Sequence, residues 1–272
     1  MGIFVEFYHY WRAEMVKLKE IKEFLDSTVP LELQDSWDNS GLQVGWSEKE
    51  VKVVGFALSA STEVLKEASE KGVNLLITHH PLTISGVRAL IPDSYPSNLF
   101  LEAVKREVAV YALHTNLDVS PYGPTAFIAQ EIGLEGEPIV EKPPYGIVGQ
   151  LKEETTQREL YGKLTSFLPP DAYRVINFNP HRKVKKVAVC SGSGASFIDA
   201  VVGRAEVFVT GDVKYHDALK AVELGLTVFD MGHFGTERLF YLPVMKLLSE
   251  AFPALDFVVL SEKSPFEVVR DA

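Results

Sequence analysis

Apolar residues recur along this chain in two patterns, one with helical spacing and one as short uninterrupted runs. Leu18, Ile21, Phe24 and Leu25 follow the helical spacing ahead of Pro30, which predicts an opening helix. After a polar, glycine-containing loop at 37–45, we expect buried strands at 51–58, 73–77 and 108–113 and helices at 62–71, 99–106 and 125–132. This alternation predicts an α/β layer with largely parallel strands.

The same order of elements returns in the second half of the chain. There we expect strands at residues 184–189, 207–209 and 226–229, and helices at 195–202, 214–224 and 236–250. We therefore predict an α/β fold of two similar lobes related by internal duplication, at residues 15–137 and 138–272. A proline-rich joint at 138–144 and an additional strand–helix–strand unit at 146–178 open the second lobe.

The composition excludes some classes of partner. Hydrophobic residues make up 46% of the chain, and no apolar run reaches the roughly 18 residues of a membrane span. The formal net charge of -10 repels phosphate backbones, which disfavours nucleic acid. The one notable basic group, formed by Lys183, Lys185 and Lys186, is expected on a solvated strand edge.

Cys190 is the only cysteine, so no disulfide can form within the chain. This fits a reducing, cytoplasmic compartment, and we expect Cys190 to be a buried structural thiol. Residues 1–14 contain charged and polar side chains such as Glu6, His9 and Arg12, which a signal peptide would not carry in its apolar core. We expect them to be a dispensable extension of a fold that begins at Met15.

Four of the seven histidines stand where a predicted strand ends, namely His79, His80, His114 and His233. Ligand sites of α/β folds lie at strand ends and in the loops that follow them. His79 and His80 are neighbours, so both can face one site only if the chain turns there, as Pro81 allows. Otherwise one of them packs against a helix.

Two of these histidines are followed by a carboxylate at the same spacing. Asp118 comes four residues after His114, and Glu237 comes four residues after His233, so each pair shares one face of a helical turn. Together with His79 and His80 they make six candidate ligands. Six donors suit two divalent ions with a bridging carboxylate, either Asp118 or Glu237. Imidazole and carboxylate donors favour Zn, Fe, Mn or Ni over Ca or Mg.

Other polar residues have a less specific pattern. Asp212 and His216 are either cleft residues behind the metal ligands or an ordinary helix start with a surface histidine. The stretch at 191–194 (SGSG) is expected to be a tight strand-to-helix turn, because it lacks the lysine of a phosphate-binding loop. His181 is expected in solvent, and no Gly-x-Ser-x-Gly nucleophile turn is present.

The candidate residues belong to five short stretches, 38–45 (DNSGLQVG), 78–81 (THHP), 114–118 (HTNLD), 210–212 (TGD) and 232–237 (GHFGTE). Together these resemble the Nif-three-like family, whose members are often named GTP cyclohydrolase 1 type 2 homologues. The resemblance runs from about Met15 to the C-terminus. It implies two similar α/β lobes with a metal cleft between them, in the short form without an inserted domain.

The same resemblance implies functional properties. The family's dinuclear metal ligands match six positions of this chain: His79, His80, His114, Asp118, His233 and Glu237. Family members are similar in forming ring-shaped homohexamers, and the family name implies hydrolytic ring opening of GTP. Our first hypothesis is a metal-dependent hydrolase that acts on a nucleotide-like or other small substrate.

Two further hypotheses remain open for the metal centre. One is a non-catalytic metal carrier or regulatory scaffold, in which the ligands fill both coordination spheres. The other is a structural interaction protein whose metal ions join the lobes. An open coordination position would distinguish catalysis from both.

Overall fold

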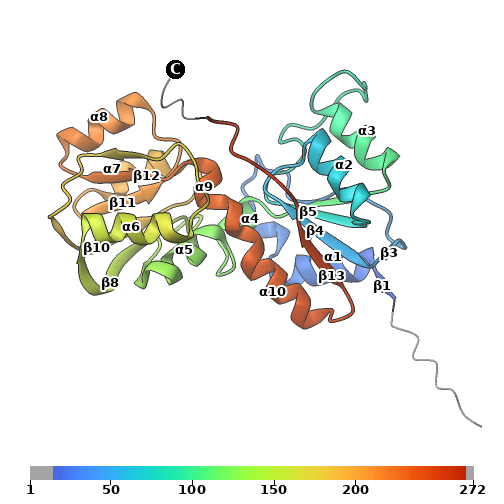
Figure 1. The fold of residues 1–272 in the computed structure, drawn as a ribbon, viewed down its shortest axis with the longest axis horizontal. Coiled ribbons are helices and arrows are strands. Elements are labelled where there is room, and N and C mark those ends of the chain that lie inside the picture. The colour runs from blue at the N-terminus through green and yellow to red at the C-terminus, as the bar shows by residue number, and fades with distance from the viewer. Residues whose placement is uncertain (1–14, 268–272) are drawn as a thin grey trace, which may run out of the picture.

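The computed structural model describes residues 15–267, so the predicted extension at 1–14 lies outside the described residues. Two sheets lie side by side, each with helices on both faces (Figure 1). This confirms the predicted α/β class. In the part of the chain that the structure describes, no helix has the length and apolar character needed to cross a membrane.

The first sheet has five strands in the order β13-β4-β5-β6-β2. Four of them are parallel: β13 (Asp256–Val259), β4 (Val53–Ala57), β5 (Leu75–Thr78) and β6 (Ala109–Ala112); β2 (Gly41–Val44) pairs antiparallel with β6. A separate ribbon pairs β1 (Val16–Lys17) with β3 (Glu50–Val51). The strand expected at 51–58 is therefore divided at Lys52, and part of the loop expected at 37–45 is strand β2.

Both faces of the first sheet are covered by helices with one apolar side. On one face lie α1 (Leu18–Thr28) and α10 (Tyr241–Ala251); on the other lie α2 (Thr62–Glu70) and α3 (Ser97–Lys105). Leu18, Ile21 and Leu25 of α1 are fully buried against the sheet, as their helical spacing predicts. The Ser61 side chain accepts a hydrogen bond from Val64 N and caps the start of α2. A short 3₁₀ turn, Leu31–Leu33, follows α1.

The second sheet has six strands in the order β7-β8-β10-β11-β12-β9. Its three central strands are parallel, β10 (Lys183–Val189), β11 (Val207–Thr210) and β12 (Thr227–Asp230). They are flanked by the antiparallel β8 (Ile147–Thr156) and β9 (Arg174–Ile176), and β7 (Leu134–Glu137) pairs with β8. Helices α5 (Pro124–Ile132) and α6 (Gln157–Phe167) cover one face, and α7 (Ile198–Val201) and α8 (Tyr215–Glu223) the other.

Sheet membership departs from the predicted division at residue 138. Strand β13 pairs in parallel with β4, so the end of the chain returns to the first sheet and gives β4 a second neighbour. Helix α10 also packs in the hydrophobic core between the first sheet and α1. Helix α5 packs on the second sheet, because its apolar residues Ile128 and Ile132 belong to the second core. A helix of the first half therefore packs on the second sheet, and the last helix and strand of the second half pack with the first sheet.

Three predicted details differ in the structure. The helix expected at 236–250 is broken into α9 (His233–Glu237), a 3₁₀ turn (Arg238–Phe240) and α10, and the helix expected at 195–202 is a 3₁₀ turn (Gly194–Phe197) followed by α7. Lys183 and Lys186 are exposed, but β10 has a neighbour on each side and is not an edge strand. Cys190 is buried and free, and His181 is exposed, as expected.

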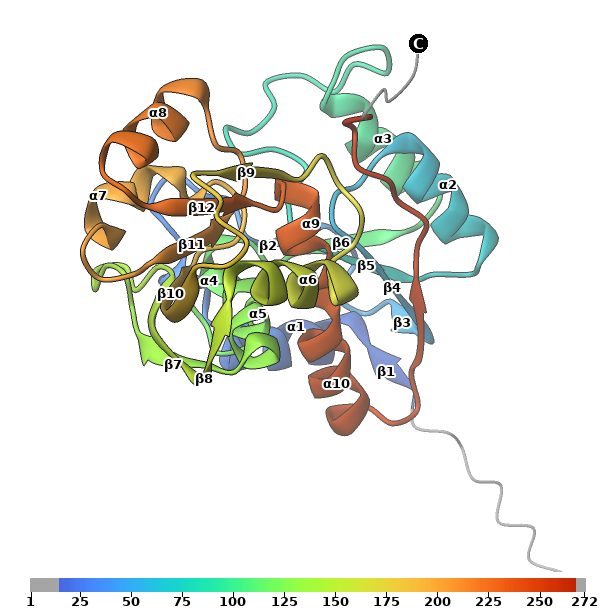
Figure 2. The same ribbon diagram turned by 60° about the vertical axis from the view of Figure 1, so that its left-hand side comes forward.

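The ends of strands from both sheets lie near the junction of the two sheets. Helix α4 (Thr115–Asp118) follows β6 of the first sheet after His114, and α9 follows β12 of the second sheet. Both short helices lie between the two sheets in Figure 1, and Figure 2 shows the same elements after a 60° turn. The residues that end β5, β6 and β12 are thereby brought to one place.

Candidate metal centre

The six predicted residues lie together between the two sheets. His79 and His80 directly follow β5, His114 precedes α4 and Asp118 is its last residue, and His233 and Glu237 are the first and last residues of α9. Three overlapping groups have ligand atoms within 4.8 Å of one another: His79, His80 and His114; His80, His233 and Glu237; and His79, Asp118 and Glu237. The cluster therefore combines donors from both halves of the chain and could hold metal.

Glu237 is the centre of this cluster. Its Oε2 atom lies 2.9 Å from His233 Nε2, 3.0 Å from His80 Nε2 and 3.6 Å from His79 Nε2. The carboxylate is buried, with a side-chain exposure of 6%. One oxygen atom of the second half thus faces three imidazoles, two of which come from the first half.

Two buried atoms of the cluster fit a cation that they would share. His79 Nε2 and Asp118 Oδ1 lie 3.5 Å apart, and neither has a hydrogen-bond partner among the described residues. A buried polar atom without a partner costs about 1–3 kcal/mol. A metal ion bound to both atoms would remove this cost, so the residues present fit the predicted ligand.

All four histidines are held in the same way. In each, Nδ1 is hydrogen-bonded to an outer partner, which leaves Nε2 for the centre. The partners are Leu113 O for His79 (2.6 Å), Ser59 Oγ for His80 (2.7 Å), Asp38 Oδ1 for His114 (2.7 Å) and Asp212 Oδ2 for His233 (2.6 Å). Such contacts fix the ring orientation and the tautomer of metal-binding histidines. The adjacent His79 and His80 therefore both turn toward the cluster.

Two of the side chains among these outer partners, those of Asp38 and Ser59, were not predicted, nor was the Leu113 carbonyl. Asp38 lies within the stretch 38–45, so the family resemblance was the feature of the sequence that could have indicated its role. Its other oxygen accepts hydrogen bonds from Ser40 Oγ and Thr115 N, at 3.0 and 3.1 Å. No feature of the sequence singled out Ser59. Asp212 holds His233 as one of the two alternatives expected, while the neighbouring His216 is exposed and joins no metal-ligand group.

The charges of the cluster shift the pKa values of its members. Burial opposes the charged imidazole, yet Asp118 and Glu237 raise the pKa of His79 to about 9. Burial likewise opposes the charge on His233, but Glu237 and Asp212 raise its pKa to about 11. The pKa of Asp118 is raised to about 6, mainly by burial. Burial opposes ionisation of Glu237 too, but His79 and His233 hold its pKa well below the usual value. These pKa shifts mean that positive charge beside the ionised Glu237 carboxylate is favourable, whether it comes from protonated imidazoles or from metal ions.

The loop at 191–194 approaches the cluster through glycine. Gly192 has a φ of +61°, and a Cβ atom there would overlap the Glu237 carboxylate. Gly211 and Gly232 also pack closely, because a Cβ on Gly211 would lie 2.7 Å from Gly232. The stretch is thus a tight turn, as expected, and the absence of a side chain at Gly192 makes room for Glu237.

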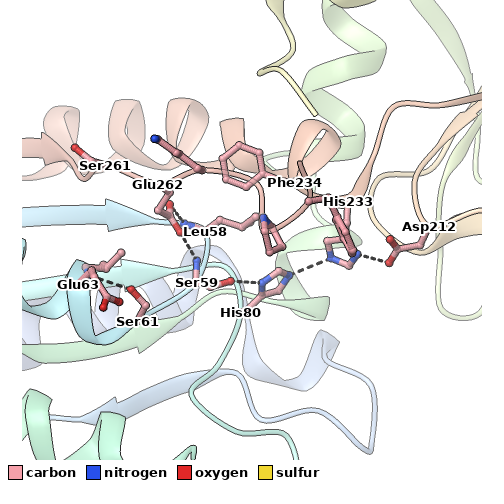
Figure 3. Close-up of a pocket in the computed structure, with 14 residues that line it drawn as sticks. Leu58, Ser59, Ser61, Glu63, His80, Asp212, His233, Phe234, Ser261 and Glu262 are labelled. Atoms are coloured by element: carbon pink, nitrogen blue, oxygen red, sulfur yellow. Dashed lines mark hydrogen bonds and ion pairs between the residues drawn. The ribbon is translucent and has the colours of Figure 1, made fainter. Parts of the chain in front are cut away.

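Two cavities reach the cluster. One of about 620 Å³ is lined by His80, Asp212 and His233 among others, and Figure 3 shows these three side chains in one row. A smaller one of about 270 Å³ is lined by His114, Asp118 and Glu237 among others. Volumes of about 300–1,000 Å³ are usual for small-molecule sites, so the larger cavity can admit a small molecule to the histidines.

Comparison with known proteins shows the family of this chain. A model of the family Duf34/NIF3 (NGG1p interacting factor 3) matches residues 16–265. The GTP cyclohydrolase 1 type 2 homolog of Campylobacter jejuni is 32% identical to this chain over 252 residues, covering 93% of this chain and 99% of the relative.

Two solved structures are similar to this chain along almost its whole length. The Bacillus cereus protein related to NIF3 has a TM-score of 0.84 at 24% identity and covers 94% of this chain and 99% of its own. Reduced HcgD from Methanocaldococcus jannaschii has a TM-score of 0.79 at 32% identity, with 91% and 98% covered. The first supports the fold, and the second extends the likeness to the sequence. With the matched family model and the curated relative, these findings establish that the chain belongs to the Duf34/NIF3 family.

Proposed function

We propose that the protein binds two divalent metal ions at the His/carboxylate cluster and uses them to hydrolyse a small molecule. The observation that carries this proposal is the position of Glu237. It belongs to two of the three ligand groups, one with His79 and Asp118 and the other with His80 and His233. A carboxylate shared by two groups suits a bridge between two ions. His114 lies with His79 and His80 in the third group and completes the set.

The donor set indicates which metals the centre would hold. Four imidazoles and two carboxylates favour Zn, Fe, Mn or Ni over Ca or Mg. A bound pair of such ions would supply an activated water and stabilise the negative charge that develops during hydrolysis. The chain itself orients the imidazoles through their Nδ1 contacts and keeps Glu237 ionised beside His79 and His233.

Hydrolysis is favoured over a purely structural role by access to the cluster. His80 and His233 are partly exposed, at 26% and 31%, and both line the larger cavity. The Campylobacter relative bears the name GTP cyclohydrolase 1 type 2 homolog, and a nucleotide-like substrate is therefore the first class to test. The alternative is a non-catalytic metal carrier, which the full burial of His79 and the large number of donors favour.

Metal content tests the proposal directly. Protein stripped of metal and reloaded with Zn, Mn, Fe or Ni should hold about two ions per chain by elemental analysis. Glu237→Gln should lose at least one ion while remaining folded, because an amide carries no charge and bridges metal ions poorly. The matched control Glu250→Gln changes an exposed carboxylate of α10 and should keep both ions.

The outcome separates the hypotheses. Two ions in Glu237→Gln would contradict the shared site, and one ion or fewer in the unaltered protein would contradict the dinuclear centre. With two ions bound, a hydrolase screen of nucleotides and other small esters and amides should give turnover that Glu237→Gln lacks. Two ions without turnover across the screen would favour the carrier.

A further inference from the structure

The larger cavity has a lining that suits a particular class of small molecule. Five of its side chains are apolar: Leu58, Val64, Phe234, Pro265 and Phe266. Phe234 immediately follows the cluster residue His233, and Leu58 immediately follows β4. In Figure 3 the labelled residues run from the first sheet past His80 to His233 and Asp212. A molecule in the cavity would therefore contact apolar surface along its length and reach the two histidines with one end.

One wall of this cavity is the C-terminal segment 261–266, which is fastened to both halves of the molecule. Glu262 accepts hydrogen bonds from Leu58 N at 2.6 Å and Ser59 N at 2.9 Å, as Figure 3 shows. It also pairs with Arg238 Nε at 3.0 Å. Ser264 Oγ donates to Asp171 Oδ1 at 2.6 Å. These contacts hold Pro265 and Phe266 beside the cavity, so the wall exists without a ligand.

The charged side chains of the cavity lining differ in whether they already have a partner. Glu262 is committed to Arg238 and two backbone amides, and Asp212 is committed to His233 and Ser193. Lys263 has no ion-pair partner among the described residues and lines the cavity. Two dications at the cluster would offset the negative charges of Asp118, Glu237 and the outer carboxylates Asp38 and Asp212, because metal-bound imidazoles are neutral. The remaining acid of the lining, Glu63, lies on the exposed first turn of α2, so Lys263 is the cationic side chain available to a ligand.

We infer that this cavity is the substrate site, and that its substrate is a small molecule with an apolar body and an anionic group. The apolar body packs between Phe234 and Phe266, and the anionic group faces Lys263 and the metal cluster. Burial of apolar area supplies the affinity, and complementary charge supplies the orientation. The inference rests on the proposed metal-dependent hydrolysis, since it names the substrate class for that site.

Two dyes with the same apolar body test the inference without a known substrate. 8-Anilinonaphthalene-1-sulfonate carries one anionic group, and N-phenyl-1-naphthylamine is its uncharged counterpart. We expect the sulfonate to bind the metal-loaded protein more tightly than the neutral dye, as followed by fluorescence titration. Phe266→Ser should weaken both dyes about threefold to tenfold through lost apolar contact. Because Phe266 is 65% exposed, this change leaves the core intact.

Two further variants separate charge from apolar contact. Lys263→Gln should weaken the sulfonate and leave the neutral dye unchanged. Tyr95→Ser is the matched control, because Tyr95 is an exposed aromatic residue outside the cavity lining, and it should bind both dyes like the unaltered protein. No sulfonate binding, or binding that Phe266→Ser leaves unchanged, would overturn the cavity as the site. Equal affinity for the two dyes, or an equal effect of Lys263→Gln on both, would overturn the anionic class.

Failure of the inference can be told from failure of the proposed function. Metal content is measured on the same samples by elemental analysis. Two bound ions with no dye site would reject the cavity and leave the metal centre standing. A dye site that responds to Phe266→Ser in a protein that binds no metal would retain the cavity and reject the metal-dependent function.

Discussion

At the residue scale, the candidate centre depends on how each ligand is held rather than on ligand identity alone. Each imidazole presents Nε2 because its Nδ1 atom is bound elsewhere. Such outer contacts commonly change metal affinity about 10–100-fold when they are lost. Glu237 is held differently, since the space beside its carboxylate exists only because residue 192 has no side chain.

Gly192→Ala should therefore weaken metal binding. The added Cβ would overlap the Glu237 carboxylate, and φ at +61° is unfavourable for alanine. We expect a loss of about tenfold or more in affinity by calorimetric titration with Zn or Mn. Gly162→Ala is the matched control, because a Cβ there meets nothing within 4 Å and alanine favours helix α6. Equal affinity in the two variants would contradict the close approach.

Metal binding should release protons at neutral pH. With the pKa of His79 raised to about 9 and that of His233 to about 11, both hold protons at pH 7 in the metal-free protein. Metal ions bind only the deprotonated rings, so apparent affinity should rise with pH between about 6 and 9. Calorimetry in two buffers with different ionisation enthalpies measures the released protons. No difference between the buffers would contradict the shifted pKa values.

The same pKa shifts predict the pH dependence of the metal-free fold. A histidine whose pKa is raised on folding stabilises the protein below its unfolded pKa, near 6.5. That contribution is lost as pH rises through the folded pKa, about 9 for His79. We expect urea unfolding of the metal-free protein to show falling stability from about pH 7 to pH 9. The metal-loaded protein should lack this slope, because its rings are already deprotonated. Constant metal-free stability over this range would refute the prediction.

At the element scale, short helical turns at strand ends assemble the centre. Helices α4 and α9 each place a carboxylate four residues after a histidine, and the C-terminal segment then fixes the cluster from outside. Glu262 of that segment binds Ser59 N, and the Ser59 hydroxyl holds His80. It also pairs with Arg238, the residue after Glu237. The Glu262 carboxylate thus contacts the residue that holds His80 and the residue that follows Glu237.

Glu262→Gln should cost stability and metal affinity together. Arg238 and Glu262 are 8% and 9% exposed, and removing one member of a buried pair leaves the other charge uncompensated, at a cost of about 3 kcal/mol. Urea denaturation and metal titration measure the two effects. Glu67→Gln is the control: Glu67 also binds the segment, through Ser261, but its ion pair with Lys71 is more exposed and should contribute less than about 1 kcal/mol. Similar losses in both variants would contradict a special role for Glu262.

At the scale of the whole molecule, one helix presents apolar side chains to solvent. Tyr215, Leu219 and Val222 of α8 are 75%, 46% and 48% exposed, and their spacing places them on one side of the helix. Exposed apolar surface of this kind is typical of contacts between proteins. We propose that it contributes to a homo-oligomer, for which the family resemblance suggests six subunits.

Light scattering tests this assembly. We expect a mass of six chains for the unaltered protein and a smaller mass for Leu219→Asp, which places a charge in the apolar group. Leu33→Asp changes a similarly exposed leucine of the first lobe, at 42% exposure, and should leave the mass unchanged. A monomer mass for the unaltered protein at micromolar concentration would refute the proposal.

Local patterns in the sequence determined much of this protein. Short apolar runs located β5, β6, β11 and β12, because burial on two faces imposes continuous apolar strands, and the pattern between those runs predicted the helices that connect them. The histidines at strand ends could also be singled out, because parallel strands bring their ends to one edge of a sheet. The resemblance carried by five short stretches led to the Duf34/NIF3 family, which the family model confirms.

Only the tertiary structure decided which distant segments meet. The pairing of β13 with β4, the packing of α5 on the second sheet and the cavity wall at 261–266 join residues far apart in the chain. Nothing in the sequence distinguishes Ser59 from other serines, and only folding places its hydroxyl 2.7 Å from His80 Nδ1. Such contacts depend on packing and hydrogen-bond geometry between elements, and they leave no periodic trace in the sequence that local reasoning can read.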